Sequence, residues 1–570
     1  MRHRSLALLS LLLVPAGLTA QQAPRPLRDT PKPASLPLKY KARPTSAEIS
    51  AADLMSRLYV FADDSMRGRE AGTAGAQKGT AYIAGELKKL GLEPAGDDGT
   101  WFQNVPFISR KLSRNTQLSV NGRLMSVFAD FVALPFRGAN ARKLNGTQAV
   151  YGGVYGDTLN AITAEQAAGK VVVLTAPNGI GRLAPTSPLQ RAAGIVVIGD
   201  ESINPLMLMQ GRLEMFTLTP TPEAPTVPVT IVATKLTARQ MLGGSPDSMP
   251  VGKLGNAIVG NLIYDEVPAP TRNVVAILRG SDAALRGEYV AIGAHSDHIG
   301  VRQYGSFDHD SLHAANAQRY FATDNPSGAP LTAEQRATRD ANLAAIHVNS
   351  DSLHKVRPAR CDSVNNGADD DGSGTVTVLE VAEAFAKAKA RPKRSVLFVW
   401  HTGEEKGLLG SRYFTDHPTV PRDSIVAQIN LDMVGRGAAT DLPAGSDRYL
   451  MLVGSRRLST ELGDLTEAVN KAEKNPFTFD YAYDANGHPE NIYCRSDHYN
   501  YARYGIPVVF LTTGLHGDYH QVTDEPQYID YPHMAHIGQF VFTLATRIAE
   551  LDHRPVVDKA KPDPAGVCRQ

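Results

Sequence analysis

The chain has 570 residues, of which 42% are hydrophobic and 21% charged, and its formal net charge is +1. This length allows two to four domains, and the aliphatic content supports large cores rather than wholesale disorder. The near-neutral balance of 59 basic and 58 acidic residues excludes a strongly basic nucleic-acid-binding protein. Three cysteines are too few for a disulfide scaffold. No internal run of about 18 apolar residues predicts a membrane-spanning helix.

The first 20 residues have the pattern of a secretory signal peptide. Arg2 and Arg4 precede an apolar run over residues 6–14, and small residues lead to Ala20. The apolar run is too short to span a bilayer, so we expect cleavage near Ala20 and a secreted or periplasmic protein. Residues 21–45 are rich in proline and predict a linker.

Export implies an oxidising compartment, in which one disulfide and one free thiol are expected from the three cysteines. Spacing leaves the connectivity open. A bond between Cys361 and Cys494 is one candidate, which would leave Cys568 free.

Two regions with different patterns follow the linker. Residues 46–115 begin with helical periodicity at 51–61 and again at 77–90, and we assign them to the main domain. Residues 116–265 carry short apolar runs, such as 170–174 and 194–198, separated by proline-rich loops. They predict an inserted β-rich domain.

From residue 266 to 555 the main domain resumes. A strand is predicted over residues 273–278, and from there strands alternate with helices. The alternation predicts an α/β fold, with a mostly parallel mixed sheet flanked by helices. Residues 301–366 interrupt it with a polar segment that has one predicted helix at 332–346. A long insertion between two motifs indicates a functional cover. Residues 556–570 are expected to be a flexible tail.

Four predicted strands end at residues of the kinds that bind metals. The strands and the residues that follow them are 289–294 with His295 and Asp297, 395–400 with His401, Glu404 and Glu405, 425–431 with Asp432, and 506–511 with His520. In open α/β sheets, ligands bind outside the carboxyl ends of the strands. A single strand-end Asp is usually a turn residue, but together these side chains form a set of the right size for two metal ions. Mixed nitrogen and oxygen ligands suit zinc best, with manganese or cobalt as substitutes.

The acidic loop at residues 367–374 precedes a helix predicted from Thr375 to about Ala388. Residues 369–380 also fit the spacing of a calcium-binding EF-hand loop. That motif needs an incoming helix, whereas the preceding residues have a loop pattern, and only one copy is present. We therefore place this loop with the His and carboxylate set.

In their order, six motifs resemble those of the M28 family of co-catalytic zinc exopeptidases. The motifs are His295-x-Asp297, Gly367-Ala368-Asp369-Asp370, Glu404-Glu405 with Gly407-Leu408-x-Gly410-Ser411, Asp432-Met433-x-Gly435, Ser496-Asp497-His498 and His520-x-x-x-Asp524. An upstream segment, Arg67-Gly68-x-x-x-Gly72-Thr73-x-Gly75, is also similar to the family's N-terminal part. The inserted domain resembles a protease-associated (PA) domain.

The resemblance implies two zinc ions per chain and a role for each motif residue. Asp370 would bridge both ions, His295 and Asp432 would complete one site, and Glu405 and His520 would complete the other. Glu404 would be the general base. Asp297 would bond the far nitrogen of His295, and Asp524 would do the same for His520. His516 competes with His520 as the ligand, and His520 fits the family pattern better.

The two-metal chemistry explains these residue types. Two zinc ions about 3.5–4 Å apart need a shared carboxylate to offset their repulsion, and they lower the pKa of bound water. A nearby Glu accepts the proton and passes it to the leaving amine. A further donor would stabilise the oxyanion, and Tyr493 and His498 are the candidates.

The resemblance predicts a secreted exopeptidase acting on peptide or protein substrates, with an aminopeptidase as the leading hypothesis. A carboxypeptidase or dipeptidase of the glutamate carboxypeptidase type would need a basic anchor for the terminal carboxylate, for which Arg495, Arg302 and Arg319 are candidates. Glutaminyl cyclisation is disfavoured by the full ligand set. A non-catalytic, receptor-like binding protein is disfavoured because the implied ligands and Glu404 are all present. Residues 301–366 would restrict the site to chain ends.

Overall fold

The computed structural model describes residues 36–134, 142–177, 179–180, 183–184, 186–219, 227–302, 307–325 and 328–570. The predicted signal peptide lies outside these residues, as does most of the predicted linker. Among the helices that are described, none is both long enough and apolar enough to cross a bilayer.

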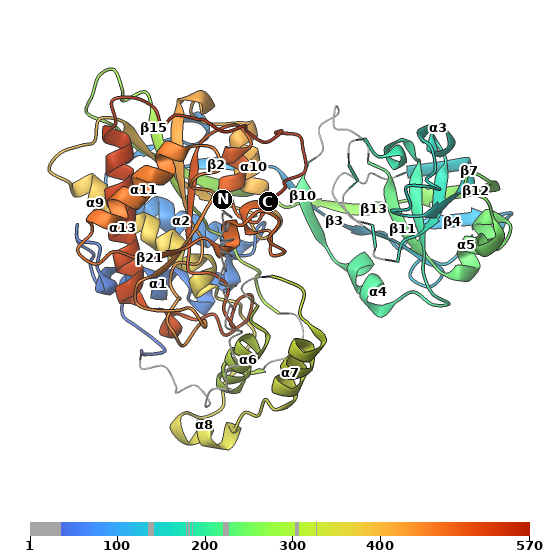
Figure 1. The fold of residues 1–570 in the computed structure, drawn as a ribbon, viewed down its shortest axis with the longest axis horizontal. Coiled ribbons are helices and arrows are strands. Elements are labelled where there is room, and N and C mark those ends of the chain that lie inside the picture. The colour runs from blue at the N-terminus through green and yellow to red at the C-terminus, as the bar shows by residue number, and fades with distance from the viewer. Residues whose placement is uncertain are drawn as a thin grey trace, which may run out of the picture.

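A nine-stranded mixed sheet forms the centre of the main domain (Figure 1). Strand order is β1-β14-β18-β15-β19-β22-β20-β21, and β2 also pairs with β14. The strands are β1 (Glu93–Pro94), β2 (Phe102–Val105), β14 (Thr271–Leu278), β15 (Tyr289–His295), β18 (Ser395–His401), β19 (Ile425–Leu431), β20 (Tyr449–Val453), β21 (Thr478–Asp480) and β22 (Val508–Thr512).

The four strands predicted to end at ligand-type residues are the neighbours β18, β15, β19 and β22. Each adjacent pair among them is parallel. All residues of these four strands are buried. Runs of Val, Ile, Leu and Ala suit such positions because helices cover both faces of a parallel sheet. The predicted α/β fold with a mixed sheet is therefore confirmed. The parallel pairs are concentrated at its centre, whereas β1, β2 and β18 pair with β14, and β20 pairs with β22, in antiparallel fashion, so the sheet as a whole is not mostly parallel.

Helices cover the two faces of the sheet. One face packs against α1 (Ala51–Phe61), α2 (Ala74–Lys89), α9 (Gly374–Lys387), α11 (Thr460–Ala472) and α13 (Tyr531–Glu550). The other face packs against α10 (Leu409–Asp416) and α12 (His498–Ala502). In α13, Met534, Ile537, Val541, Leu544 and Ile548 recur at helical spacing and are all fully buried.

A second sheet of eight strands lies beside the main domain, as Figure 1 shows on its right-hand side. The strands are β4 (Gln117–Val120), β5 (Arg123–Met125), β6 (Phe131–Leu134), β7 (Arg142–Val154), β8 (Val171–Thr175), β9 (Gly194–Ile198), β11 (Val229–Ala233) and β12 (Leu254–Leu262). These bounds fall inside the predicted insertion at 116–265. Its short helices are α3 (Ala164–Ala167), α4 (Pro205–Arg212) and α5 (Lys235–Leu242). Its likeness to a PA domain stays a prediction.

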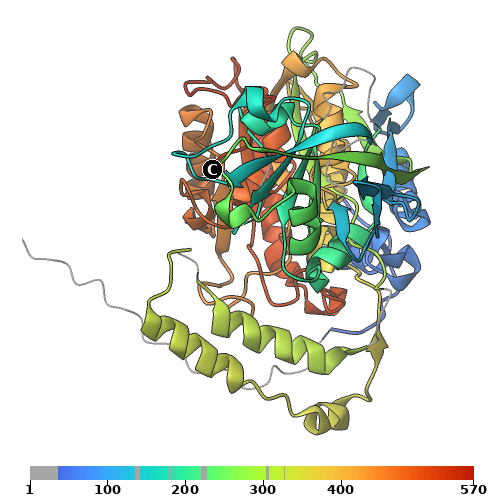
Figure 2. The same cartoon turned by 90° about the vertical axis from the view of Figure 1, so that its right-hand side faces the viewer.

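A three-stranded sheet lies where the chain enters and leaves this second sheet. It consists of β10 (Met215–Leu218), β3 (Phe107–Leu112) and β13 (Tyr264–Pro268). Figure 2 looks onto the second sheet, with the main domain behind it.

The polar insertion at residues 301–366 forms a helical arm below the main domain (Figures 1 and 2). Its elements are β16 (Phe307–Asp308), α6 (His309–Thr323), α7 (Ala333–Ala344), α8 (Ser350–Val356) and β17 (Cys361–Asp362). Strands β16 and β17 pair and close the base of the arm. The predicted helix at 332–346 corresponds to α7, which Thr332 and Gln335 cap reciprocally.

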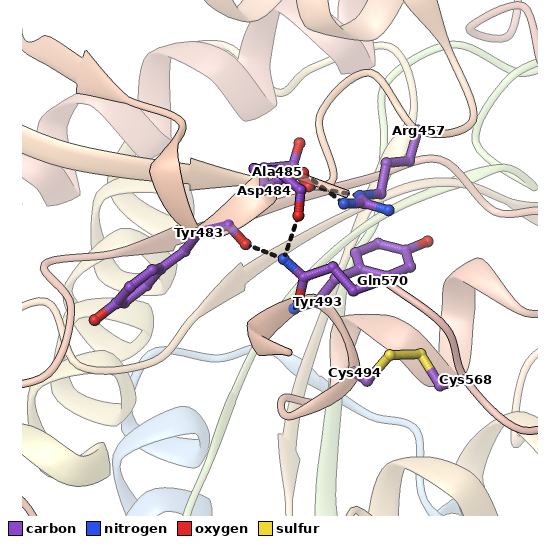
Figure 3. The surroundings of a disulfide bond; sticks show 8 residues. All are labelled: Arg457, Tyr483, Asp484, Ala485, Tyr493, Cys494, Cys568 and Gln570. Carbon is purple, nitrogen blue, oxygen red and sulfur yellow. Dashed lines mark hydrogen bonds and ion pairs between the residues drawn. A yellow bond between two sulfur atoms is a disulfide. The ribbon is translucent and has the colours of Figure 1, made fainter. Parts of the chain in front are cut away.

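The C-terminal segment differs from the sequence expectation. Cys494 bonds to Cys568, with 5.8 Å between their Cα atoms, and the free thiol is the exposed Cys361. The candidate pairing of Cys361 with Cys494 is therefore wrong. Residues 556–570 were expected to be a flexible tail, but the terminal Gln570 also bonds the backbone of Tyr483 and of Ala485 (Figure 3). The disulfide and these bonds hold the tail against the main domain.

Candidate metal centre

The predicted ligands meet at the carboxyl edge of the four parallel strands. His295 is the last residue of β15, Asp432 directly follows β19, and Glu404 and Glu405 lie three and four residues past the end of β18. His520 lies in the loop after β22. Because parallel strands all end at one edge, side chains far apart in sequence come together there.

His295, Asp370 and Asp432 form the first of two linked groups. The Nε2 atom of His295 lies 3.2 Å from Oδ1 of Asp370 and 3.6 Å from Oδ1 of Asp432. Three ligand atoms, one from each residue, all lie within 4.8 Å of one another. Ser496 Oγ donates to the second oxygen of Asp432 at 2.7 Å, so one oxygen is held and the other faces the histidine.

The second group shares Asp370 with the first. His520 Nε2 lies 3.1 Å from Oδ2 of Asp370 and 3.0 Å from Oε2 of Glu405. Burial lowers the pKa of His520, but Asp370 and Glu405 outweigh it and bring the value to about 10. These carboxylates thus create a strong demand for positive charge at this position.

His298 is a member of the second group that sequence reasoning missed. Its Nδ1 atom lies 2.8 Å from Oε1 of Glu405 and 3.7 Å from Oδ2 of Asp370. The imidazole is fully buried. Its signal in the sequence was the spacing His295-x-x-His298, which places a second histidine just past the same strand end.

Asp370 is held by the loop that connects β17 to α9. Asp524 accepts the backbone N–H groups of Asp369, at 2.9 Å, and Asp370, at 3.0 Å. The carboxylate of Asp371 accepts the N–H of His295, at 3.0 Å, and that of Gly374, at 2.9 Å. These bonds tie the loop that carries Asp370 to the end of β15.

The EF-hand alternative does not match this loop. Asp369 Oδ1 accepts the N–H of Gly435 at 2.6 Å, and His516 Nε2 faces the other oxygen at 3.1 Å. Glu380, which would be the last calcium ligand, is buried in α9 and pairs with Arg57. His516, the competing ligand in the last motif, therefore lies against Asp369, whereas His520 lies against Asp370 and Glu405.

Asp297 and Asp524 support the site through bonds other than those expected. His295 Nδ1 lies 3.0 Å from the backbone oxygen of Asp297, whereas the Asp297 carboxylate is 3.9 Å away. That carboxylate instead accepts the N–H of Glu404 at 3.1 Å. Both oxygens of Asp524 are used by the backbone of the Asp370 loop rather than by His520.

Glu404 lies beside the two groups and faces a pocket. Its Oε2 atom is 3.9 Å from Nε2 of His295. Burial raises the pKa of Glu404 well above its ordinary value; His295 opposes this, and repulsion from Glu405 and Asp432 adds to it. A carboxylate in such surroundings is a stronger base than one in water.

The donor atoms have the spacing that a metal ion requires. Bonds of about 2.0–2.2 Å at tetrahedral angles place the ligand atoms of one zinc about 3.3–3.6 Å apart. The nitrogen–oxygen pairs of His295 and His520 with Asp370 and Glu405 are 3.0–3.2 Å apart, and the pair of His295 and Asp432 is 3.6 Å apart. The Nε2 atoms of His295 and His520 are buried and have no hydrogen-bond partner among the described residues. The donor set therefore fits one or two divalent cations.

The pocket beside the donor atoms has about 440 Å³ of empty space. Asp370, Glu404 and Asp432 are its acidic lining residues. The other lining residues are Met433, Tyr483, Ile492, Arg495, Ser496, Phe510, Thr512, Gly514, Leu515 and Tyr519. The lining thus combines three acidic side chains with mostly apolar and aromatic ones.

Tyr493 and His498, the predicted oxyanion donors, lie beneath this pocket and do not line it in the described part of the chain. Tyr493 is 2% exposed, and the Arg457 guanidinium lies 4.4 Å from its ring centroid (Figure 3). His498 is fully buried and stacks on Phe510 at 4.6 Å. The short 3-10 turn at Ile492–Cys494, held by the disulfide, carries Tyr493 into the interior.

Tyr519 is a hydroxyl-bearing residue that lines the pocket next to His520 and that sequence reasoning missed. Its ring stacks on His520, with 3.9 Å between centroids, and Arg495 Nη2 donates to its hydroxyl at 3.3 Å. Burial and then the carboxylates of Asp370 and Glu405 raise the pKa of Tyr519, so the hydroxyl keeps its proton. Its position next to His520 was the available signal.

The three candidate anchors for a substrate carboxylate lie in different places. Arg495 lines the pocket and also pairs with Glu490 at 2.9 Å. Arg302 donates to the side chain of Gln521 at 2.8 Å. Arg319 is exposed on α6. Of the three, Arg495 alone lines the pocket that the structure describes.

His and carboxylate donors lie here at the carboxyl edge of four parallel strands, beside a pocket. This arrangement is typical of metal-dependent enzymes with an α/β fold. Residues 273–545 match the sequence model described as Peptidase family M28. This region, a little under half of the chain, is therefore similar to the peptidases of family M28.

Curated relatives cover part of the chain. Leucine aminopeptidase 1 of Paracoccidioides brasiliensis (strain Pb18) is 31% identical over 220 residues, which are 37% of this chain and 53% of the relative. Leucine aminopeptidase 1 of Uncinocarpus reesii (strain UAMH 1704) is 31% identical over 222 residues, 37% of this chain and 52% of the relative. The chain spans about half the length of the curated relatives it matches.

Among the solved structures that match the chain is an aminopeptidase from Aneurinibacillus sp. strain AM-1, with 15% identity, a TM-score of 0.48, and coverage of 90% of this chain and 97% of that one. The zinc aminopeptidase BSAP from Bacillus subtilis has 15% identity, a TM-score of 0.42, and coverage of 90% and 99%.

Proposed function

We propose that this protein is a secreted aminopeptidase that uses two zinc ions to hydrolyse peptide bonds at chain ends. The observation that carries the proposal is the pair of His and carboxylate groups that share Asp370, with Glu404 beside them and lining the same pocket. The names of the curated relatives support the choice of an aminopeptidase.

His295, Asp370 and Asp432 would hold one zinc, and Asp370, Glu405 and His520 the other. His298 lies close enough to Glu405 either to join the second set or to orient that carboxylate. When bound, the two ions would polarise the scissile carbonyl and make water acidic enough to attack at neutral pH.

Glu404 would accept the proton of the attacking water and transfer it to the leaving amine. Its neighbour Glu405 points to His298 and His520, whereas Glu404 lines the pocket where a substrate would lie. The N–H of Glu404 bonds Asp297, which holds this base relative to the end of β15. Two adjacent acids thus divide metal binding and proton transfer between them.

Tyr519 would donate a hydrogen bond from its hydroxyl to the oxyanion of the tetrahedral intermediate. It lines the pocket next to His520, and burial with the nearby carboxylates of Asp370 and Glu405 raises its pKa, which favours the protonated hydroxyl. Donors aimed at developing charge in a partly dry pocket contribute much of the rate enhancement of enzymes.

The acidic lining of the pocket, from Asp370, Glu404 and Asp432, would attract a substrate's positively charged α-amine. Arg495 gives one specific reason for a second candidate, a carboxypeptidase, because a pocket-lining guanidinium could pair with a terminal carboxylate. Its ion pair with Glu490 and its bond to Tyr519 already occupy part of the guanidinium.

Secretion is proposed from the basic and apolar pattern of residues 1–20. The bond between Cys494 and Cys568 supports export, because disulfides persist mainly in oxidising compartments.

The test uses the zinc-loaded mature protein and one peptide in three forms: free, N-acetylated and C-amidated. Mass spectrometry follows the products. We expect shortening from the N-terminus that acetylation blocks and amidation does not. Shortening from the C-terminus that amidation blocks would replace the proposal with the carboxypeptidase. Glu404→Gln serves as the control for contaminating peptidases.

A further inference from the structure

A third His and carboxylate cluster lies at the base of the helical arm, built from residues that the proposed active site does not use. His309 is the first residue of α6, Asp362 is the last residue of β17, and Glu525 lies in the loop after His520. One ligand-type atom from each residue lies within 4.8 Å of the others. Three segments far apart in sequence therefore converge at one point.

His309 has the burial and the free ring nitrogen of a metal ligand. Its side chain is fully buried, and its Nδ1 atom lies 3.0 Å from Oδ2 of Asp362. Its Nε2 atom is buried and has no hydrogen-bond partner in the part of the chain that the structure describes. Burial also lowers the pKa of this imidazole, which favours the neutral form that binds metals.

Glu525 is a buried carboxylate without an ion pair among the described residues. It is 8% exposed and accepts one hydrogen bond from Asn366 Nδ2 at 2.9 Å. The same amide nitrogen donates to Asp64 at 2.7 Å. Burial and then repulsion from Asp362, with Asp64 contributing less, raise the pKa of Glu525, although Asn366 and Arg360 oppose this. Arg360 forms its own ion pair with Asp310, at 3.4 Å.

A bound cation would stabilise this buried cluster of one imidazole and two carboxylates. A buried carboxylate costs several kcal/mol unless a proton or a positive charge accompanies it. One imidazole nitrogen and two carboxylate oxygens make a donor set that zinc and similar divalent ions accept. Solvent or the second oxygen of a carboxylate can complete the coordination.

We propose that His309, Asp362 and Glu525 bind a third divalent cation of the zinc type, which fastens the helical arm to the catalytic domain. The site joins both ends of the arm, His309 and Asp362, to the loop that carries His520. Glu525 also directly follows Asp524, which holds the backbone of Asp369 and Asp370. The third cation thus stabilises the loop on which the bridging carboxylate rests.

The experiment measures zinc per chain in the mature protein, loaded with Zn²⁺ alone and then desalted. Wild type is expected to retain three zinc ions, and Glu525→Gln and Asp362→Asn two each. The matched control is Asp351→Asn, an exposed carboxylate on α8 in the same arm, which should retain three. Equal zinc content in wild type and in both cluster variants would overturn the proposal.

A second measurement uses the wild-type protein and so does not depend on the folding of the variants. Crystals of the zinc-loaded wild-type protein are measured at the zinc absorption edge. An anomalous peak among His309, Asp362 and Glu525 supports the site. Peaks near His295 and His520 with none at the arm overturn it.

The two proposals fail separately. If the protein cleaves no peptide but Glu525→Gln still loses one zinc, the third site stands and the peptidase proposal falls. If peptides are cleaved and His520→Ala loses zinc while Glu525→Gln loses none, the peptidase proposal stands and the third site falls.

Discussion

The disulfide between Cys494 and Cys568 should make a large and measurable contribution to the stability of the main domain. We expect the double variant Cys494→Ser/Cys568→Ser to lose about 4 kcal/mol of unfolding free energy at 25 °C. The bond closes a loop with a sequence separation of 74, and a cross-link over that length removes about this much chain entropy from the unfolded state. Changing both cysteines leaves no new thiol.

Tryptophan fluorescence during urea unfolding reports this effect selectively. The chain has two tryptophans, Trp101 and Trp400, and both pack in the core of the main domain rather than in the second sheet. The midpoint for the main domain should therefore move to lower urea, with little change in slope. This readout avoids the mixed signal that a chain with two sheets gives in circular dichroism.

Cys361→Ser is the matched control, because Cys361 is exposed and free. It should leave the urea midpoint unchanged. Peptide mapping of the wild-type protein without reductant should recover Cys494 linked to Cys568. A midpoint loss in Cys361→Ser equal to that of the double variant, or a recovered link between Cys361 and Cys494, would refute the reasoning.

Three further predictions concern the site and the core. Glu404→Ala should keep its zinc but lose nearly all peptide hydrolysis, and loss of zinc with proportional loss of activity would move the base role elsewhere. Arg57→Met should lower the unfolding free energy, measured in urea, by about 3–5 kcal/mol, because Glu380 and Glu383 would stay buried without their cation. The double variant Arg57→Met/Glu380→Met should recover part of this loss. A double variant as unstable as Arg57→Met would contradict the ion-pair explanation. Replacing residues 328–349 with a Gly-Ser linker should permit cleavage within N-acetylated peptides, because α7 lines a second pocket that adjoins the first. If mass spectrometry finds the same products as for wild type, the arm has no role in chain-end specificity.

The helical arm connects to the candidate metal centre through contacts beyond the third cluster. His313 of α6 lies 2.9 Å from Asp518 and stacks on Tyr528 at 3.8 Å. Asn316 Nδ2 donates to Thr523 at 3.2 Å. The contacted residues Asp518, Thr523 and Tyr528 lie close to His520 in sequence, so the arm packs against the loop that carries this predicted ligand. Its position agrees with the expectation of a functional cover, whose role stays a prediction.

Residue order alone was enough to predict the architecture that positions the site. Apolar runs of five to seven residues indicate buried strands, and helical periodicity indicates the segments between them. Once the central strands are parallel, their carboxyl ends must share one edge, so His295, Glu405, Asp432 and His520 had to come close together. This part of the prediction depends on local patterns and on strand direction.

The tertiary structure decided which atoms make each contact. Asp524 bonds the backbone of the Asp370 loop instead of His520, Tyr493 turns into the interior while Tyr519 lines the pocket, and Cys494 pairs with Cys568. These outcomes depend on the paths of loops and of the C-terminal segment, which carry no periodic pattern. A side chain's direction in a loop is set by packing against residues far away in sequence, and so spacing could identify the residues of the site but not their individual partners.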